Sequence, residues 1–318
     1  INSESAVLEV HGESIDEAIA FLSAALTTLP KDPSKKHFFR CVIVRDREAF
    51  RSIVDERSPM VLVLPESLQD LAIPAAKKGH HVFIPLSKDV VSSTSNSFIL
   101  PIPDRDEFKN ALVGLDIEEE RANSLCVDSG RSLPVLQRLI GLTKNPEWAT
   151  AENATILLPA LLIGAWDGNN EHDRDIISRL AKKDYEDIES EYTKWAFSND
   201  APLRNTGTLW HHTSRLDSWR LLSRNISKLQ LERFAEIANE ILSEKDPSFN
   251  VADNKRWLST EKIRFSNALR EGVLQTFILL ATSTAGIGFK ANNHPENWVS
   301  VQVKKLITNA SEERWYSL

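Results

Sequence analysis

The first half of the chain alternates apolar runs, each suited to a buried strand, with segments of helical periodicity. The runs occupy residues 6–10, 41–44, 60–64, 81–85 and 98–100. They are mostly continuous instead of alternating with polar positions, which is typical of strands covered on both faces of a parallel sheet. Helical segments follow the first three runs at residues 15–29, 46–54 and 68–78. Ser14 and Glu17 form a capping box at the start of the first one, in which Ser14 accepts from the amide three residues on and Glu17 reaches back. We therefore predict an open, mostly parallel sheet with flanking helices, linked by βαβ crossovers.

The second half of the chain has helical periodicity. Helices are predicted at residues 156–166, 172–182, 185–197, 216–224, 229–243, 265–282 and 296–309. Cap signals precede two of them, at Ser214 and Ser227. No unit of fixed length recurs, so an irregular helical bundle is predicted instead of a regular solenoid. The predicted fold class is therefore α/β followed by all-α.

A step in composition separates the two halves. All eight Trp and all three Tyr lie at or after Trp148. We predict an α/β, Rossmann-like domain over residues 1–103, a small helical region over 104–147 and a helical domain over 148–318. The chain begins with Ile1 instead of methionine, so we also expect it to be a piece of a longer polypeptide.

The net charge and the apolar content of the chain argue against nucleic acid and membranes as partners. Hydrophobic residues make up 42% of the chain and the net charge is −7, so the whole molecule is not expected to attract nucleic acid or an anionic membrane. The longest apolar stretch, residues 273–281, is far shorter than the roughly 20 residues that span a bilayer. Cys41 and Cys126 form no CxxC pair and are expected to be reduced, so a cytoplasmic location is predicted.

The sequence lacks the common motifs for nucleotide or acyl-transfer chemistry. Neither a GxxxxGK[ST] phosphate loop nor a GxGxxG loop occurs among its eleven glycines, and no GxSxG element is present. Such loops need glycine so that consecutive backbone amides can face the phosphates. The chain therefore carries no complete catalytic set that we recognise, and we do not expect it to be an active enzyme by itself.

Three polar clusters have the composition of metal ligands but not the spacing. The pairs His80–His81 and His211–His212 are adjacent, and adjacent side chains point apart on a strand or a helix. Residues 167–173 (DGNNEHD) hold alternating oxygen ligands, but their glycine is second instead of sixth as in a calcium loop. Structural histidines and a polar turn are the favoured interpretations.

One turn in the middle of the chain is suited to an anion. Gly130, Arg131 and Ser132 precede a helical segment at residues 133–139, where Ser132 takes the N-cap position and Pro134 the first turn. Arg131 beside the amides of a helix start could contact a negatively charged group. A surface arginine next to an ordinary helix cap fits the same residues, and both interpretations stay open.

The residues around this turn carry a family resemblance. The segments FILPIPDRDEF (98–108), ALVGL, ERANSL and SGRSLPVLQRL (129–139) together resemble the lid region of AAA+ and STAND-type NTPases. The resemblance implies that Arg131 corresponds to a sensor arginine within a glycine-containing turn, and that residues 104–147 are lid-like. It also implies that residues 41–44 form the strand that ends in a metal-linked acid, which would be Asp46.

The position of Asp46 also has an explanation that does not depend on the family resemblance. It follows an apolar run and precedes a helical segment, so its carboxylate is placed to cap that helix. Under the resemblance, Asp46, Gly130, Arg131 and Ser132 are instead candidate contacts of ATP or ADP. The helical remainder then resembles the regulatory arm of large bacterial STAND proteins, which include antiviral defence ATPases.

The sequence leaves three hypotheses for the function of the chain. The leading hypothesis is a regulatory or nucleotide-sensing segment of a larger STAND-like protein, acting by conformational gating and self-association. The alternative is a non-enzymatic module whose Trp-rich helical half binds a protein partner. The third is a hydrolase or nuclease, which would require carboxylates converging on one site.

Overall fold

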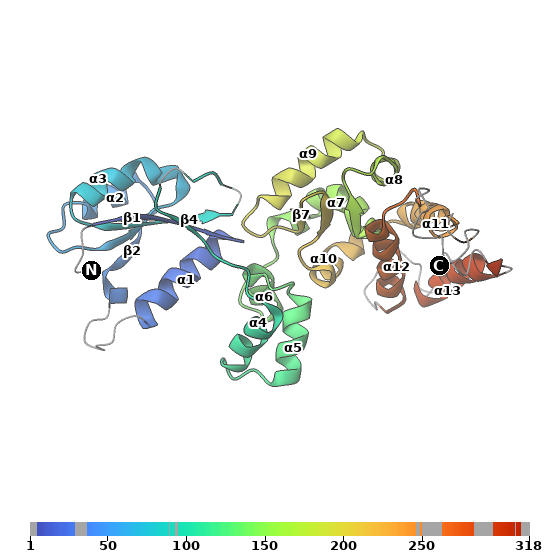
Figure 1. Ribbon diagram of the computed structural model, residues 1–318, viewed down its shortest axis with the longest axis horizontal. Helices are drawn as coiled ribbons and strands as arrows, with labels where there is room; N and C mark the ends of the chain where they lie inside the picture. The colour runs from blue at the N-terminus through green and yellow to red at the C-terminus, as the bar shows by residue number, and fades with distance from the viewer. Residues whose placement is uncertain are drawn as a thin grey trace. The chain divides into compact units, whose positions relative to one another are not determined.

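The computed structural model describes residues 5–28, 37–88, 90–92, 95–245, 249, 263–282, 295–308 and 310–312. The chain divides into two compact units (Figure 1). The first unit is formed by residues 1–142 with 197–200, and the second by residues 143–196 with 201–318. No helix within the described part of the chain is both long enough and apolar enough to cross a membrane.

The first unit is built on a parallel five-stranded sheet. Its strands are β1 (Val7–Gly12), β2 (Cys41–Ile43), β3 (Val61–Val63), β4 (His81–Ser87) and β5 (Ser97–Ile99). They lie side by side in the order β2-β3-β4-β1-β5, and every pair is parallel. The predicted fold class, a parallel α/β sheet followed by a helical region, is confirmed.

Helices cover both faces of this sheet, which explains why its strands are apolar on both sides. Helix α1 (Ile15–Thr28) packs on one face, where Val10, Val63 and Phe83 are buried. Helices α2 (Arg47–Ile53) and α3 (Ala72–Lys77) pack on the other face (Figure 1). Short 3₁₀ helices at His37–Arg40 and Glu66–Leu71 complete the connections.

Three short helices follow the last strand of the sheet. They are α4 (Arg105–Val113), α5 (Glu119–Asp128) and α6 (Leu133–Leu139). Asp104 and Glu107 form a capping box that starts α4, with the Asp104 carboxylate accepting from the Glu107 amide at 2.7 Å. Leu112, Leu125 and Leu136 lie in the small apolar core that these helices share.

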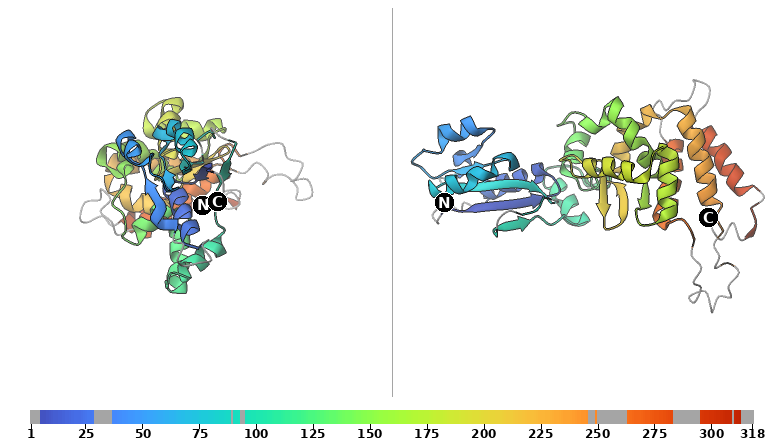
Figure 2. Two further views of the ribbon diagram at one scale, coloured as in Figure 1. Left: turned by 90° about the vertical axis from the view of Figure 1, so that its left-hand side faces the viewer. Right: turned by 90° about the horizontal axis from the view of Figure 1, so that it is seen from above.

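The second unit is mainly helical and has one large apolar core. Its helices are α7 (Ala151–Ile163), α8 (Glu171–Ala181), α9 (Tyr185–Ala196), α10 (Arg215–Leu222), α11 (Lys228–Leu242), α12 (Asn267–Thr282) and α13 (Pro295–Ile307), with 3₁₀ turns at Glu147–Ala149 and Ser223–Asn225. Helix α7 is buried along its whole second half, so it forms the centre of this core. Helices α11 to α13, coloured orange to red, pack together (Figure 2). The predicted end of the last helix, Asn309, lies outside the described residues.

The second unit also contains a small antiparallel sheet that the sequence patterns did not predict. Strands β6 (Ala165–Asp167), β8 (Leu209–His212) and β7 (Leu203–Thr206) lie side by side in that order. The helix predicted at residues 156–166 ends earlier, because Gly164 adopts a φ of 88° that leaves the helical region. Three or four residues are too few to set a period of two against the surrounding helical pattern.

Candidate functional site

The turn from β1 to α1 lies at the position where open α/β sheets bind ligands. In such sheets ligands bind beyond the carboxyl ends of the strands. Strand β1 continues into α1, and its parallel neighbour β4 ends beside it, where Gly12 pairs with Ser87. The carboxyl ends of β1 and β4 therefore mark the candidate site of the first unit.

The connection between β1 and α1 is too tight for a phosphate loop. Only Glu13 and Ser14 separate the last strand residue, Gly12, from the start of the helix. A Cβ atom added to Gly12 would lie 2.8 Å from the Ser14 carbonyl oxygen and 3.3 Å from the Ala18 amide nitrogen. Glycine is required here because the backbone of the helix start folds directly over the end of the strand.

Side chains of the protein itself occupy the amides at this helix start. The Ser14 hydroxyl accepts from the Glu17 amide at 3.2 Å, as the capping signal predicts. The Glu17 carboxylate turns back and accepts from the Glu13 amide at 2.9 Å. The positive end of the helix is therefore already paired with a carboxylate.

The end of β4 closes the site from the other side. The Lys88 amide donates to the Gly12 carbonyl at 2.8 Å, and the Lys88 ammonium donates to the Glu13 carboxylate at 2.6 Å. The side chain of Glu13 is only 10% exposed, so this ion pair is shielded from water more than most surface pairs. Two carboxylates and one paired ammonium therefore line the position that a ligand would take.

Two further polar groups are buried on β1 beside this site. Glu9 and His11 lie two residues apart, hence on one face of the strand, and are 0% and 3% exposed. The Glu9 carboxylate accepts from the Ser92 hydroxyl at 2.6 Å, and His11 Nδ1 lies 3.3 Å from the Ser87 carbonyl oxygen. Neither residue was predicted to be functional from the sequence. The only local signal was that Glu9 and His11 interrupt an otherwise apolar strand.

Asp46 lies at one edge of the sheet, where it caps α2. One of its carboxylate oxygens accepts from the Glu48 amide at 2.9 Å and from the Ala49 amide at 2.8 Å. Strand β2, which precedes it, is the edge strand on that side, while β5, which leads to the three short helices, is the opposite edge. The sheet therefore does not bring Asp46 next to Arg131.

Gly130, Arg131 and Ser132 lie together in the turn between α5 and α6. Gly130 and Arg131 have φ angles of 58° and 60°, which for arginine is a strained left-handed conformation. All three amides bond within the turn, to the Val127 carbonyl, the Ser129 hydroxyl and the Ser129 carbonyl. Ser132 is the N-cap residue of α6, as predicted, but its side chain forms no cap hydrogen bond.

The Arg131 side chain contacts the segment that leaves the sheet. Its guanidinium donates to the Pro103 carbonyl at 2.9 Å, just before α4 begins. The contact ties the last of the three short helices to the chain that enters the first. The guanidinium is half-buried and has further donors beyond this bond.

The clusters that resembled metal ligands have structural roles. His80 is fully buried and lies 3.0 Å from the Val54 carbonyl and 3.3 Å from the Met60 amide. Within residues 167–173 the Asn170 side chain caps α8 by accepting from the His172 and Asp173 amides. Among the residues that the structure describes, no three His, Cys, Asp or Glu side chains gather to hold a metal ion.

Comparison with known proteins gives one distant likeness. Neither a protein-family model nor a curated protein matches this chain. A signal transduction ATPase with numerous domains (STAND) protein with a tetratricopeptide repeat sensor, from Pyrococcus horikoshii, matches in structure with 10% identity and a TM-score of 0.26. The match covers 77% of this chain and 44% of that protein, so this chain spans under half of its length. A likeness this distant carries no argument about family or function.

Proposed function

We propose that this chain is a regulatory segment of a STAND-like protein whose α/β unit acts without hydrolysing a nucleotide itself. The sequence resemblance at residues 98–139 supports the family part of the proposal, because those residues form a sheet edge followed by three short helices. The region 104–147 would then be the lid-like part, and its movement against the sheet would be the regulatory signal.

One observation carries the proposal: the closed turn between β1 and α1. A phosphate bound at the carboxyl ends of β1 and β4 would meet the carboxylates of Glu13 and Glu17 instead of free amides. Like charges repel, and separating Glu13 from Lys88 would leave a largely buried carboxylate unpaired. The first unit is therefore better suited to holding a fixed conformation than to binding and releasing a nucleotide at this position.

Protein binding is the second candidate, and the sheet edge favours it. All three residues of the edge strand β5 are exposed, and the side chains of Phe98 and Ile99 are 48% and 67% exposed. An exposed apolar edge strand is a site at which another chain can add a strand. Self-association or a protein partner would cover these side chains.

Thermal unfolding in the presence of nucleotide separates nucleotide sensing from purely structural regulation. A ligand present at about 100 times its dissociation constant stabilises the folded state by about 2.7 kcal/mol. We expect ATP and ADP at about 1 mM, with or without magnesium, to leave the unfolding of the first unit unchanged. A clear stabilisation that disappears in Arg131→Ala would instead support a nucleotide-sensing lid, with Arg105→Ala on α4 as the control.

A further inference from the structure

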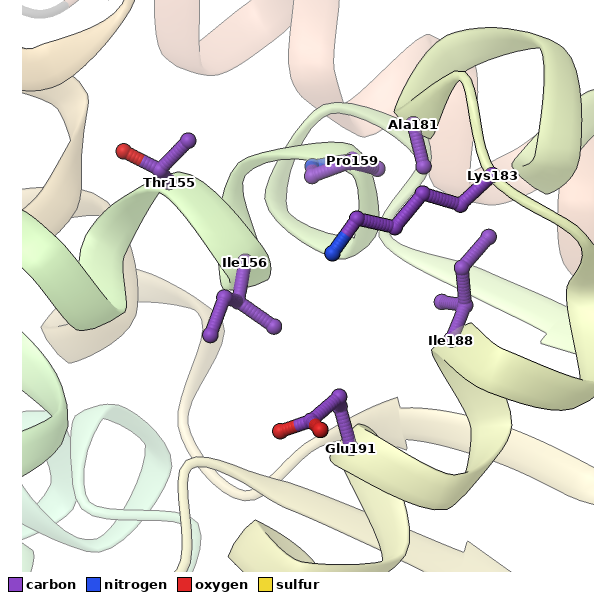
Figure 3. Close-up of a pocket in the computed structure, with 7 residues that line it drawn as sticks. All are labelled: Thr155, Ile156, Pro159, Ala181, Lys183, Ile188 and Glu191. Carbon is purple, nitrogen blue, oxygen red and sulfur yellow. The ribbon is translucent and has the colours of Figure 1, made fainter.

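A small pocket in the second unit has an apolar floor and one charge of each sign at its rim. It lies between α7, the end of α8 and the start of α9, and its volume is about 90 Å³ (Figure 3). Pro159 in its wall is buried within α7, and Ile188 belongs to the main core of the unit, so the floor is formed by buried side chains. Ile156 packs on the edge of the same core and lines the pocket as well.

The positive charge is Lys183, and its backbone position is fixed by a helix cap. Lys182 ends α8 in the left-handed conformation, with a φ of 58°, and its amide donates to the Ser178 carbonyl at 2.7 Å. This cap directs the Lys183 stem past Ala181 and across the pocket (Figure 3). Within the described part of the chain no carboxylate forms an ion pair with Lys183, so its ammonium is available to a ligand.

The negative charge is Glu191 on α9. Its carboxylate lies across the pocket from the Lys183 ammonium (Figure 3). It contacts the Lys194 ammonium at 2.8 Å, in an i,i+3 pair in which the Lys194 side chain is 65% exposed. An exposed pair of this kind contributes little energy, so a carboxylate can accept a second cation at small cost.

Besides the Lys183 and Glu191 side chains, the pocket has a backbone hydrogen-bond acceptor. Pro159 lies inside α7 and has no amide hydrogen, so the carbonyl of Thr155, four residues earlier, lacks its usual helical partner. Thr155 and Pro159 both line the pocket. The carbonyl that Pro159 leaves without a helical donor therefore belongs to a residue that lines the pocket, and a ligand amine is a suitable donor for it.

We propose that this pocket binds a free aliphatic α-amino acid. The ligand carboxylate pairs with Lys183, its ammonium with Glu191 and the Thr155 carbonyl, and its side chain packs on Ile156, Pro159 and Ile188. The pocket volume of about 90 Å³ is smaller than the roughly 150 Å³ of a cavity that holds benzene, so it accommodates the branched side chain of valine or leucine and leaves the ammonium and carboxylate groups at the rim. The inference goes beyond the proposed function and does not depend on it.

Titration of the intact, isotope-labelled chain with L-leucine, followed by amide NMR, tests the proposal. We expect saturable shifts confined to amides of α7, the α8–α9 turn and α9, with a dissociation constant of about 0.1–5 mM. Lys183→Met keeps the apolar stem and removes the charge, so it should weaken binding about tenfold or more. The matched control is Lys182→Met, the neighbouring lysine outside the pocket wall, which should bind leucine as the native chain does.

Two leucine derivatives identify the groups that are recognised. Leucinamide lacks the carboxylate and N-acetyl-leucine lacks the ammonium, so each should bind at least about tenfold more weakly than leucine. The proposal is wrong if leucine gives no saturable shift at about 20 mM, or if Lys183→Met binds it as well as Lys182→Met does while both variants keep the native spectrum. N-acetyl-leucine binding as tightly as leucine would also overturn it, because the occupant would then be the end of a peptide.

Discussion

Lys88 donates to the Glu13 carboxylate across 2.6 Å and so joins the end of β4 to the end of β1. The two residues are separated by 75 positions in the sequence, yet they meet at the one place where a sheet of this kind binds ligands. Because the Glu13 side chain is only 10% exposed, the carboxylate depends on this ammonium for its charge balance. The pair therefore closes the site and stabilises the first unit at the same time.

Removing this ammonium should destabilise the first unit. Lys88→Met keeps the stem but leaves a largely buried carboxylate unpaired, which should cost about 1–3 kcal/mol. The control is Lys78→Met, since Lys78 pairs with Asp55 in an exposed pair with side chains 59% and 74% accessible, and its loss should leave the stability nearly unchanged. Urea unfolding followed by far-UV circular dichroism measures both. Equal stabilities of the two variants would contradict this role of Glu13.

Tryptophan fluorescence separates the two units in such experiments. All eight Trp lie at or after Trp148, and the first unit, residues 1–142 with 197–200, contains none of them. A change in the first unit should therefore alter the circular dichroism transition and leave the fluorescence transition unchanged. This distinction gives each variant an internal control.

Adding one methyl group at the turn before α1 should be costly. In Gly12→Ala the new Cβ would lie 2.8 Å from the Ser14 carbonyl oxygen, and backbone cannot move aside as a side chain can. We expect a loss of about 1–3 kcal/mol in the unfolding free energy. Gly114→Ala is the control, because its nearest contact is 3.4 Å and its φ is −63°, so it should be neutral or slightly stabilising. A tolerated Gly12→Ala would mean that the turn has room to open.

The strained turn between α5 and α6 should tolerate glycine better than alanine at position 131. Arg131→Ala removes the bond to the Pro103 carbonyl and keeps a side chain at a φ of 60°, so it should destabilise by about 1 kcal/mol. Arg131→Gly removes the same bond but relieves the backbone, so it should be more stable than Arg131→Ala by about 1 kcal/mol. Chemical unfolding of both variants checks the order. The reverse order would show that Arg131 is not strained in solution.

A buried histidine should make the second unit sensitive to acid. Burial, with a smaller effect of the Arg215 cation, lowers the pKa of His212 to about 3. The unfolded chain binds this proton near pH 6.5 and the folded chain does not, so stability falls as pH drops from about 6.5 toward 3, by about 1.4 kcal/mol per pH unit. His212→Asn retains a polar atom for the Ser218 hydroxyl, which lies 3.0 Å from His212 Nδ1, and should flatten this dependence.

The measurement is urea unfolding by Trp fluorescence at several pH values. The control is His172→Gln, which replaces a histidine whose side chain is 42% exposed and should leave the loss of stability in acid as it is in the native chain. If His212→Asn loses stability in acid as steeply as the native chain does, another group is responsible.

The sequence patterns located the first sheet because its signals are local. Runs such as residues 41–44 and 60–64 are apolar at nearly every position, and Asp46 and Ser214 mark helix starts by side-chain chemistry that acts over three residues. The strands of the second sheet were missed because each has only three or four residues and includes polar ones, so none stands out as an apolar run. One local signal was present, the two-residue loop Gly207–Thr208 between Leu203–Thr206 and Leu209–His212.

The candidate site was not predictable in the same way. The absence of a glycine-rich loop was visible in the sequence, and so was the capping box that brings the Glu17 carboxylate back to the helix start, but the pairing of Glu13 with Lys88 was not. Glu17 acts locally on the Glu13 amide, whereas Lys88 arrives from a distant strand whose position is set by the order of the sheet. The turn at Arg131 was predictable only in its local features. Ser132 takes the predicted N-cap position, but the left-handed conformation of Arg131 and its bond to Pro103 depend on packing among α4, α5 and α6.

Isothermal titration calorimetry of the intact chain with ATP and ADP, each with and without magnesium, tests the central proposal most directly. The closed turn predicts no binding heat with a dissociation constant below about 1 mM for either nucleotide. The same result is expected for Arg131→Ala. Binding of ATP or ADP with a dissociation constant below about 100 μM, weakened at least about tenfold by Arg131→Ala and not by Arg105→Ala, would contradict the account.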